Sequence, residues 1–287
     1  MATSRPAPIT QKQVASFLKP RPKDSHKGLF GTVTVIGGAS GMVGAALLAG
    51  RAALKMGAGC VHVGMLADNA PAVDLLQPEL MLHTAGDALR STRPDVMVVG
   101  CGLGQSPAAQ KVLYDALLLD VALVLDADAL NLIAMRPDLR GMLHTRKAPA
   151  VFTPHPGEAA RLLGCTTEDV QKDRGRSALS LVERLGGSVV LKGAGSICAM
   201  RNARLYINQT GNPGMSSAGM GDVLSGMIAA FIAQGLSADE AMLLGVHLHG
   251  AAGDELAKQQ ATLGMSATEV TEWARWLLNR WYAKPKG

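Results

Sequence analysis

The residues best suited to chemistry lie in one glycine-rich segment, TGNPGMSSAGMGDVLSGMIAAFIAQG (Thr210–Gly235). Its glycines crowd the positions before Asp222, and a long apolar, helix-like run follows. The glycines are Gly211, Gly214, Gly219 and Gly221. Backbone N–H groups at such a helix start can hold a phosphoryl group, and an Asp in the first turn can take a proton from an attacking hydroxyl. The alternative interpretation is that Asp222 only interacts with the helix dipole. That alternative is weakened because a helix cap needs one glycine and this segment has four. The pattern is not a Walker loop.

Chemistry-bearing residues also follow the short apolar runs that predict strands. GGASGMVGAALLAG (Gly37–Gly50) follows TVTVIG, and VVGCGLG (Val98–Gly104) carries glycines past a second run. Asp126 and Asp128 follow a third run, and His155 stands between two prolines after a fourth. Because the carboxyl ends of parallel strands form the ligand crevice of an open α/β sheet, these residues predict one shared site.

Each of these residues also has a plainer interpretation. The glycine turn at Gly37–Gly50 is explained equally well by packing, since its spacing is not G-x-G-x-x-G and no acidic residue closes the next strand. Helix N-capping is expected for Asp126 or Asp128. A favourable first-turn charge is the preferred interpretation of Glu158. A solvated turn is disfavoured for His155, because the flanking prolines restrict its backbone.

The segment Lys192-Gly193-Ala194-Gly195-Ser196 has two open interpretations. It lies at a predicted strand end before a tight turn. It either faces a nucleotide or forms an ordinary hairpin, and the pattern alone does not separate the two.

The elements that must position these residues form an α/β pattern. Continuously apolar strands alternate with helices, which predicts a mostly parallel sheet covered on both faces. Three closely spaced runs then predict hairpins and an antiparallel margin. Predicted parallel strands are Thr32–Gly37, Cys60–Met65, Val96–Gly100, Val121–Asp126 and Ala150–Thr153. Predicted hairpin strands are Ser188–Lys192, Ser196–Met200 and Arg204–Asn208. Predicted helices are Val43–Met56, Pro107–Leu119, Ala218–Gln234, Ala238–Lys258 and Ala267–Tyr282. Ser237/Glu240 and Ser266/Glu269 are capping boxes that mark the last two helix starts.

Composition restricts the class of protein. The 287 residues carry a net charge of +5, 33 glycines, four Phe, three Tyr and three Trp. Few aromatics argue against base-stacking platforms, and dispersed Lys and Arg argue against nucleic-acid binding. The charge permits a phosphate-bearing small molecule. The four cysteines are scattered, so we expect free thiols. The sequence has no secretory hydrophobic core and no apolar run of bilayer length, so we expect a cytoplasmic location and no membrane association.

Taken together, the motifs resemble the ribokinase-like superfamily, and most closely its ADP- or ATP-dependent NAD(P)H-hydrate dehydratases. The resemblance spans about residues 25–280. The matching segments, in family order, are Ser25–Gly59, GCGLG (Gly100–Gly104), LDADALN (Leu125–Asn131), TPHPGE (Thr153–Glu158), VLKGAGS (Val190–Ser196) and GNPGMSSAGMGDVLSG (Gly211–Gly226). The expected fold is a three-layer α/β sandwich, with residues 1–24 as an N-terminal extension and 25–283 as a single domain.

The resemblance implies a repair enzyme, a carbon–oxygen lyase that dehydrates the S form of hydrated NADH and NADPH at the expense of ADP. The ring hydroxyl would be phosphorylated and phosphate then eliminated, giving NAD(P)H, AMP and phosphate. Ala45, Gly102, His155 and Asp222 would bind the hydrate, with Asp222 catalytic. Lys192, Gly193, Ala194, Gly195, Ser196 and Gly221 would bind the adenine nucleotide. No residue is assigned as a metal ligand.

Further expectations follow from the same resemblance. Mg²⁺ would be a cofactor, the assembly a homotetramer, and the epimerase that many relatives carry would reside on another chain. Met220 departs from the Thr of many relatives, which removes one hydroxyl donor but leaves the backbone N–H groups. The alternatives are a ribokinase-like kinase of a vitamin alcohol and a non-catalytic dinucleotide-binding protein that would not need Asp222.

Overall fold

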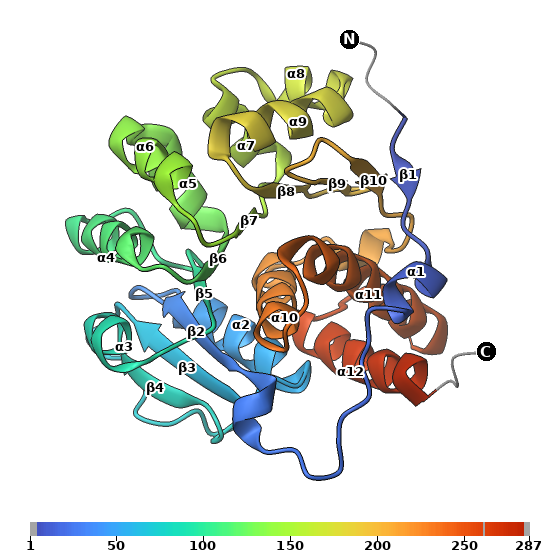
Figure 1. Ribbon diagram of the computed structural model, residues 1–287, viewed down its shortest axis with the longest axis horizontal. Helices are drawn as coiled ribbons and strands as arrows, with labels where there is room; N and C mark the ends of the chain where they lie inside the picture. The colour runs from blue at the N-terminus through green and yellow to red at the C-terminus, as the bar shows by residue number, and fades with distance from the viewer. Residues whose placement is uncertain (1–4, 261, 284–287) are drawn as a thin grey trace.

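The computed structural model describes residues 5–260 and 262–283, which build a ten-stranded sheet between two layers of helices (Figure 1). The strand order across the sheet is β1-β10-β9-β8-β7-β6-β5-β2-β3-β4. The strands are β1 (Ala7–Pro8), β2 (Thr32–Gly37), β3 (Cys60–Met65), β4 (Met81–Thr84), β5 (Val96–Val99), β6 (Ala122–Leu125), β7 (Ala150–Phe152), β8 (Ser188–Leu191), β9 (Ile197–Ala199) and β10 (Leu205–Ile207). From β4 through β8 all neighbours are parallel, whereas β9 is antiparallel to both β8 and β10. The expected antiparallel margin is thereby confirmed.

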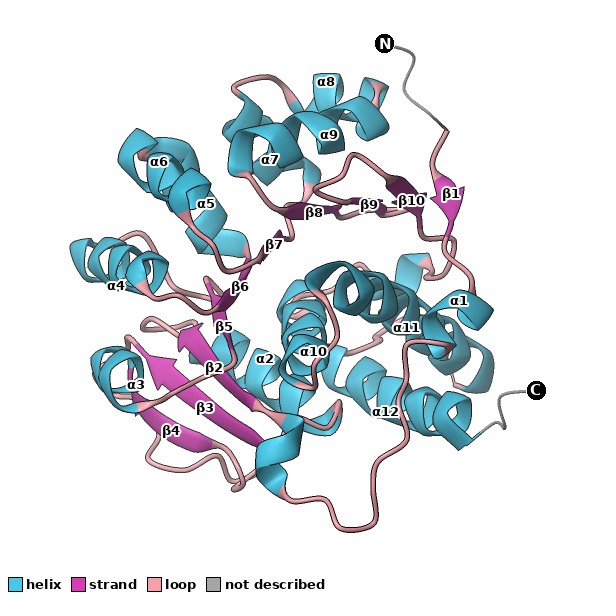
Figure 2. Cartoon of the chain, viewed as in Figure 1, coloured by secondary structure: helices cyan, strands magenta, loops and turns pink. Residues whose placement is uncertain are grey.

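Helices cover both faces of this sheet (Figure 2). One layer contains α2 (Val43–Lys55), α10 (Met220–Ala233), α11 (Ala238–Gln259) and α12 (Ala267–Ala283). The other contains α3 (Ala85–Ser91), α4 (Pro107–Leu118), α5 (Ala127–Met135), α6 (Pro137–Thr145), α7 (Pro156–Leu163), α8 (Thr167–Lys172) and α9 (Arg174–Leu185). Short helical segments are α1 (Gln11–Ala15) and the 3₁₀ turns Lys27–Phe30 and Pro213–Met215. The three-layer arrangement matches the expected fold class.

Each central strand contributes side chains to the packing against both helix layers, because successive side chains point to opposite faces of the sheet. In β5, Val96 and Val98 pack in the core beside α10, whereas Met97 and Val99 pack in the core beside α4 and α5. The strand is therefore apolar throughout, as a strand buried on both faces must be. Packing on both faces holds the strands in place, so their carboxyl ends form a fixed edge at which a site can be built.

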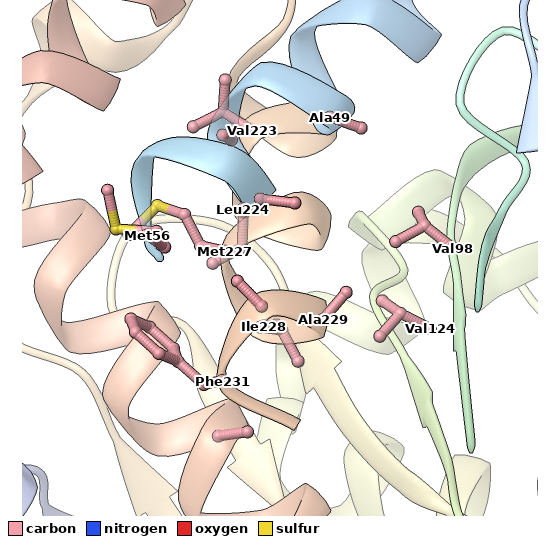
Figure 3. Packing of buried hydrophobic residues seen from close by; sticks show 14 of the residues in the cluster. Ala49, Met56, Val98, Val124, Val223, Leu224, Met227, Ile228, Ala229 and Phe231 are labelled. Carbon is pink, nitrogen blue, oxygen red and sulfur yellow. The ribbon is translucent and has the colours of Figure 1, made fainter. Parts of the chain in front are cut away.

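The packing of α10 against α2 holds the glycine-rich helix start in place. Met227 and Val223 of α10 lie beside α2 with Ala49 and Met56, while Ala229 faces Val98 and Val124 of the sheet (Figure 3). Gly226 permits the closest approach, since a Cβ at this position would overlap the carbonyl oxygen of Ala49.

Gly226→Ala is expected to destabilise the fold by roughly 1–3 kcal/mol, because backbone atoms on α2 cannot move aside as a flexible side chain can. Urea unfolding measures the change. Gly141→Ala is the matched control: Gly141 is also helical, but its added Cβ meets nothing within 4 Å, and the variant should gain roughly 0.5–1 kcal/mol. Equal stability of the two variants would contradict the proposed close contact.

The N-terminal residues pack onto the same core. β1 pairs in parallel with β10, and Ile9 and Val14 are buried within the α10–α12 layer. One guanidinium nitrogen of Arg21 donates hydrogen bonds to Gly57 O at 2.8 Å and to Gln234 Oε1 at 2.7 Å. These acceptors lie just after the C-terminal ends of α2 and α10, where a cation is favoured. A cavity of about 550 Å³ lies beside Arg21, and none of the predicted site residues lines it.

Most predicted elements are confirmed to within one or two residues. Ser106 caps α4, and both capping boxes form as expected. The strands β1 and β4 and the helices α1, α3, α6, α8 and α9 were not individually predicted from the sequence. All four cysteines are free; Cys101 and Cys198 are buried, whereas Cys165 is exposed. Within the residues that the structure describes, no helix is both long and apolar enough to cross a membrane.

Candidate active site

The predicted site residues meet where the carboxyl ends of β2 and β5–β8 face the N-terminal end of α10. Asp222 is the third residue of α10, and Gly219 is its N-cap with a left-handed φ of +89°. That conformation is readily available to glycine. The helix therefore begins abruptly at the sheet edge, with its first backbone N–H groups and the Asp222 carboxyl on the same turn.

Asp222 is partly buried, and its environment disfavours the charged form. Burial, reinforced by the nearby Asp126 carboxylate, raises the pKa of Asp222 to about 6. The nearby Cys101 thiol and the positive charge of Lys192 act in the opposite direction. The carboxyl group therefore titrates close to neutral pH, where a proton acceptor is most effective.

Asp126 and Lys192 form a buried ion pair beneath the glycine-rich loop. Lys192 Nζ donates to Asp126 Oδ1 at 2.7 Å, and Ser225 Oγ donates to Asp126 Oδ2 at 2.9 Å. Asp126 also accepts from Ala127 N at 2.9 Å as the N-cap of α5, so the expected capping role is confirmed. The pair lies directly under Gly221: a Cβ there would be 3.1 Å from Lys192 Nζ and 3.3 Å from Asp126 Oδ2.

The ion pair explains the charge states around it. Burial opposes the ionised form of Asp126, but Lys192 outweighs it and the pKa of Asp126 is lowered. Burial likewise disfavours the Lys192 ammonium, yet Asp126 and Glu158 raise the pKa of Lys192. Both groups remain charged at neutral pH. The Lys192 ammonium, paired with Asp126, thus lies behind the loop that is expected to receive phosphate.

Glu158 and His155 extend this network along the first turn of α7. Glu158 Oε2 accepts from His155 N at 2.7 Å, while His155 Nδ1 accepts from Gly157 N at 3.0 Å. These contacts form a capping box. The preferred first-turn interpretation of Glu158 is therefore confirmed, but Glu158 is also only 4% exposed and lies 4.0 Å from Lys192 Nζ.

His155 is half exposed and, with Nδ1 accepting, presents Nε2 as its N–H group. Burial and the charge of Lys192 lower the pKa of His155, so the ring is neutral at neutral pH. The ring is thus a helix cap, and its Nε2 lies 3.4 Å from Glu158 Oε1, so a ligand acceptor would compete with that carboxylate for the Nε2–H group.

Gly102 and Ala45 lie against each other beyond the ends of β5 and β2. Gly102 has a φ of +60°, and a Cβ there would be 2.6 Å from the Met42 carbonyl oxygen and 3.1 Å from Ala45 Cβ. Ala39 N donates to Gly102 O at 2.7 Å, which joins the loops after β2 and β5. A side chain at position 102 would therefore overlap Met42, so glycine is required there.

The segment Lys192–Ser196 is the turn of the β8–β9 hairpin. Gly193 and Gly195 have positive φ angles, and Ser196 Oγ donates to Gly193 O at 3.0 Å. Arg174 donates to Leu191 O at 3.1 Å and to Gly195 O at 3.3 Å, so a guanidinium fixes the turn from behind. The segment is a hairpin turn, and Lys192 at its start reaches into the site, so the two interpretations do not exclude each other.

Several site residues were missed by sequence reasoning. Ser225 could have been found, since it lies three residues after Asp222 on the same helix face. Arg174 carries no local signal, because its partners are 17 and 21 residues away. Met220 lies in the apolar core at 7% exposure, so its side chain packs instead of lining the loop.

The described residues contain no group of three or more His, Cys, Asp or Glu side chains that could hold a metal ion. Asp126 is already bonded to Lys192, Ser225 and Ala127 N. The donor set fits Mg²⁺ only in the manner of nucleotide sites, where phosphate oxygens and water supply most ligands and a carboxylate contributes one or two. Glu158, 4% exposed and 4.0 Å from Lys192 Nζ, is a further carboxylate at this site.

Comparison with known proteins places this geometry in a family. The sequence model of the NAD(P)H-hydrate dehydratase family matches residues 33–275. The ADP-dependent (S)-NAD(P)H-hydrate dehydratase of Neisseria meningitidis is 43% identical over 267 residues, covering 91% of this chain and 90% of that protein. The chain belongs to the NAD(P)H-hydrate dehydratase family. The resemblance drawn from the motifs is therefore confirmed.

Other dehydratase relatives differ in length. The bifunctional NAD(P)H-hydrate repair enzyme of Escherichia coli is 45% identical over 265 residues, covering 91% of this chain. The match covers 50% of that bifunctional relative, so this chain spans about half its length. Among solved structures, the ADP/ATP-dependent NAD(P)H-hydrate dehydratase of Bacillus subtilis, co-crystallised with ATP and Mg²⁺, superimposes with a TM-score of 0.85 at 29% identity. It covers 96% of this chain and 98% of that one.

The ribokinase-like fold is also confirmed by these structural likenesses. A hydroxyethylthiazole kinase from Pyrococcus horikoshii superimposes with a TM-score of 0.62 at 16% identity, covering 96% of this chain and 95% of that one. At that identity the likeness shows the fold alone. The kinase alternative is therefore less well supported than the dehydratase.

Proposed function

We propose that this chain is an ADP-dependent dehydratase of S-form hydrated NADH and NADPH, releasing NAD(P)H, AMP and phosphate. One observation carries the proposal: in a chain of the dehydratase family, a carboxyl group with a pKa of about 6 stands on the first turn of α10 beside the glycine-rich loop. The site thereby combines a proton acceptor with backbone donors for phosphate. Both elements are ones that phosphoryl transfer to a hydroxyl requires.

In the first step, the ring hydroxyl of the hydrate attacks the terminal phosphorus of ADP. Asp222 accepts the hydroxyl proton as the new oxygen–phosphorus bond forms and AMP departs. N–H groups at the start of α10 stabilise the charge on the transferred phosphoryl oxygens. Lys192, which lies under Gly221, adds a fixed positive charge at the same place.

In the second step, the phosphate ester leaves more readily than hydroxide would. The ring nitrogen lone pair expels phosphate as the carbon–oxygen bond breaks. A proton on the adjacent ring carbon is then lost, which restores the dihydronicotinamide. A Mg²⁺ ion, when bound with the nucleotide, would neutralise charge on its phosphates, and Glu158 would contribute a carboxylate to it.

The other assignments rest on position around Asp222. Gly102 and Ala45 are small residues that leave space for the hydrate, and His155 supplies an N–H donor to it. The hairpin turn Lys192–Ser196 and Gly221 supply the nucleotide contacts. The homotetramer and the cytoplasmic location remain predictions of the sequence.

His155→Ala is expected to raise the KM for the hydrate about tenfold and the KM for ADP much less, because the ring is assigned to the hydrate. His155→Asn is the control, since Asn retains the N-cap while removing the imidazole. Steady-state kinetics with each substrate varied in turn measures both constants. A larger effect on the KM for ADP, or full recovery in the Asn variant, would remove the His155 ring from the hydrate site.

The proposed activity is tested by incubating the protein with hydrated NADH and with ADP, ATP or no nucleotide. Return of the near-ultraviolet absorbance of reduced nicotinamide, dependent on a nucleotide, supports the dehydratase. ATP-dependent phosphorylation of a vitamin alcohol without that return would instead support the kinase. Cofactor binding without nucleotide breakdown would support a non-catalytic role.

A further inference from the structure

The glycine-rich loop before α10 begins against one face of α11. A Cβ at Gly250 would overlap Thr210, and a Cβ at Gly253 would overlap the sulfur of Met215. Residues three and four apart lie on the same face of a helix, so Gly250, Gly253 and Asp254 share this face. The loop therefore packs directly on the backbone of α11, and the Asp254 side chain lies beside it.

The Asp254 carboxylate binds two successive residues of this loop. Gly211 N donates to Asp254 Oδ2 at 2.9 Å, and Asn212 Nδ2 donates to Asp254 Oδ1 at 3.1 Å. Asn212 Oδ1 in turn accepts from Gly214 N at 3.0 Å. We call these three hydrogen bonds the Asp254 clamp. Because two of them end on a carboxylate, they are stronger than bonds between neutral groups, and together they fix the backbone from Gly211 to Gly214.

The same loop is held again just before α10. Ser217 Oγ donates to Met265 O at 2.9 Å, and Gly219 then forms the left-handed cap of the helix. The backbone that leads to Asp222 is thus fixed at both ends. Such fixing matters for catalysis, since N–H groups stabilise a transition state only when they are held in place beforehand. A displacement of about 1 Å can cost about 100-fold in rate.

We propose that Asp254 is a positioning residue for the phosphate-binding end of the site. Through Gly211 and Asn212, it holds the glycine-rich loop so that N–H groups at the start of α10 meet the transferred phosphoryl group. The inference rests on the proposed function for its kinetic effect, whereas the clamp itself is testable without substrates. Because the hairpin turn Lys192–Ser196 is assigned to the nucleotide, loss of the clamp should affect kcat more than the KM for ADP.

The first test is Asp254→Asn. The new amide has one acceptor oxygen, and its NH₂ group would face the NH₂ group of Asn212, so at least one bond of the clamp is lost. With rates normalised to the folded fraction from circular dichroism, kcat should fall at least about tenfold, while the KM for ADP changes less than about threefold. Glu255→Gln is the matched control. It makes the same change at the next residue of α11, where Glu255 pairs with Lys258 at 3.8 Å, and kcat should stay within about twofold.

Reversing the polarity of the clamp provides a rescue. Asn212→Asp alone places two carboxylates against each other and should also lower kcat. In Asp254→Asn/Asn212→Asp, the amide at 254 donates to the carboxylate at 212, while their oxygens still accept from Gly211 N and Gly214 N. We expect kcat to return to within about threefold of the wild type. A kcat in this double variant as low as in Asp254→Asn, or an unchanged kcat in Asp254→Asn, would overturn the positioning role.

Amide hydrogen exchange separates this inference from the proposed function. In protein without substrates, the Gly211 N–H should exchange at least about tenfold faster in Asp254→Ala, which removes both acceptors, than in the wild type. Equal exchange would overturn the clamp even if the wild type is active. If the wild type restores no reduced nicotinamide, the proposed function fails, whereas faster exchange would still establish the clamp. Should Asp254→Asn not fold, Asn212→Ala replaces it in the kinetic test with the same expected split between kcat and KM.

Discussion

The Asp222→Asn variant is expected to lose NAD(P)H recovery by about 10³-fold or more while remaining folded. Asn keeps the size and the helix position of Asp222 but cannot accept the hydroxyl proton. Loss of a general base typically costs 10²–10⁴-fold, and here the same residue also faces the transferred phosphoryl group. Because burial and Asp126 disfavour the charged form of Asp222, removing its charge should not lower stability. The rate is measured from the return of nicotinamide absorbance with saturating ADP.

Two controls make the Asp222→Asn result specific. Isothermal titration calorimetry should give ADP affinity within a few-fold of the wild type, because the hairpin turn and Lys192 are intact. Asp115→Asn, a helical substitution in an exposed pair with Lys111, should retain full activity. Activity in Asp222→Asn within about tenfold of the wild type would exclude Asp222 as the proton acceptor.

Lys192→Met is expected to lower the free energy of unfolding by about 3–5 kcal/mol and to abolish measurable activity. Met replaces the length of the side chain but leaves the carboxylate of Asp126, which is 1% exposed, without its ion-pair partner. Removing one member of a buried pair costs more than the pair contributes, because the remaining charge stays desolvated. Chemical denaturation followed by circular dichroism measures the loss.

A double-mutant cycle separates the structural effect of Lys192 from its functional effect. In Lys192→Met/Asp126→Asn, Asn can still cap α5 and bond Ser225, so much of the stability should return. Activity should not return, because no positive charge then lies under Gly221. Lys111→Met, at an exposed pair, should change stability by less than about 0.5 kcal/mol. Stability of Lys192→Met equal to that of the wild type would contradict the buried ion pair.

Local sequence patterns predicted the elements that carry the site. The glycines before Asp222 forecast a helix start, and Gly219 does supply the left-handed cap of α10. Pro156 and Glu158 forecast the start of α7, where the capping box forms. Strands such as β2 were predictable because burial on both faces makes them continuously apolar. β4 was not, since it is a short edge strand with partly exposed side chains.

The contacts within the site required the order of strands, which local patterns do not contain. Lys192 meets Asp126 across 66 residues because β8, β7 and β6 are neighbours, and Ser225 meets Asp126 across 99 residues through α10. The direction of the Lys192 side chain, toward Asp126, likewise could not be predicted from the pattern of its hairpin.

The central claim is tested most directly by the products formed from hydrated NADH and ADP. The absorbance of reduced nicotinamide, AMP and inorganic phosphate should appear at equal rates, one of each per hydrate consumed. No product should form without nucleotide or with Asp222→Asn. Return of the absorbance without ADP consumption, or formation of AMP and phosphate without that return, would contradict dehydration through a phosphorylated ring hydroxyl.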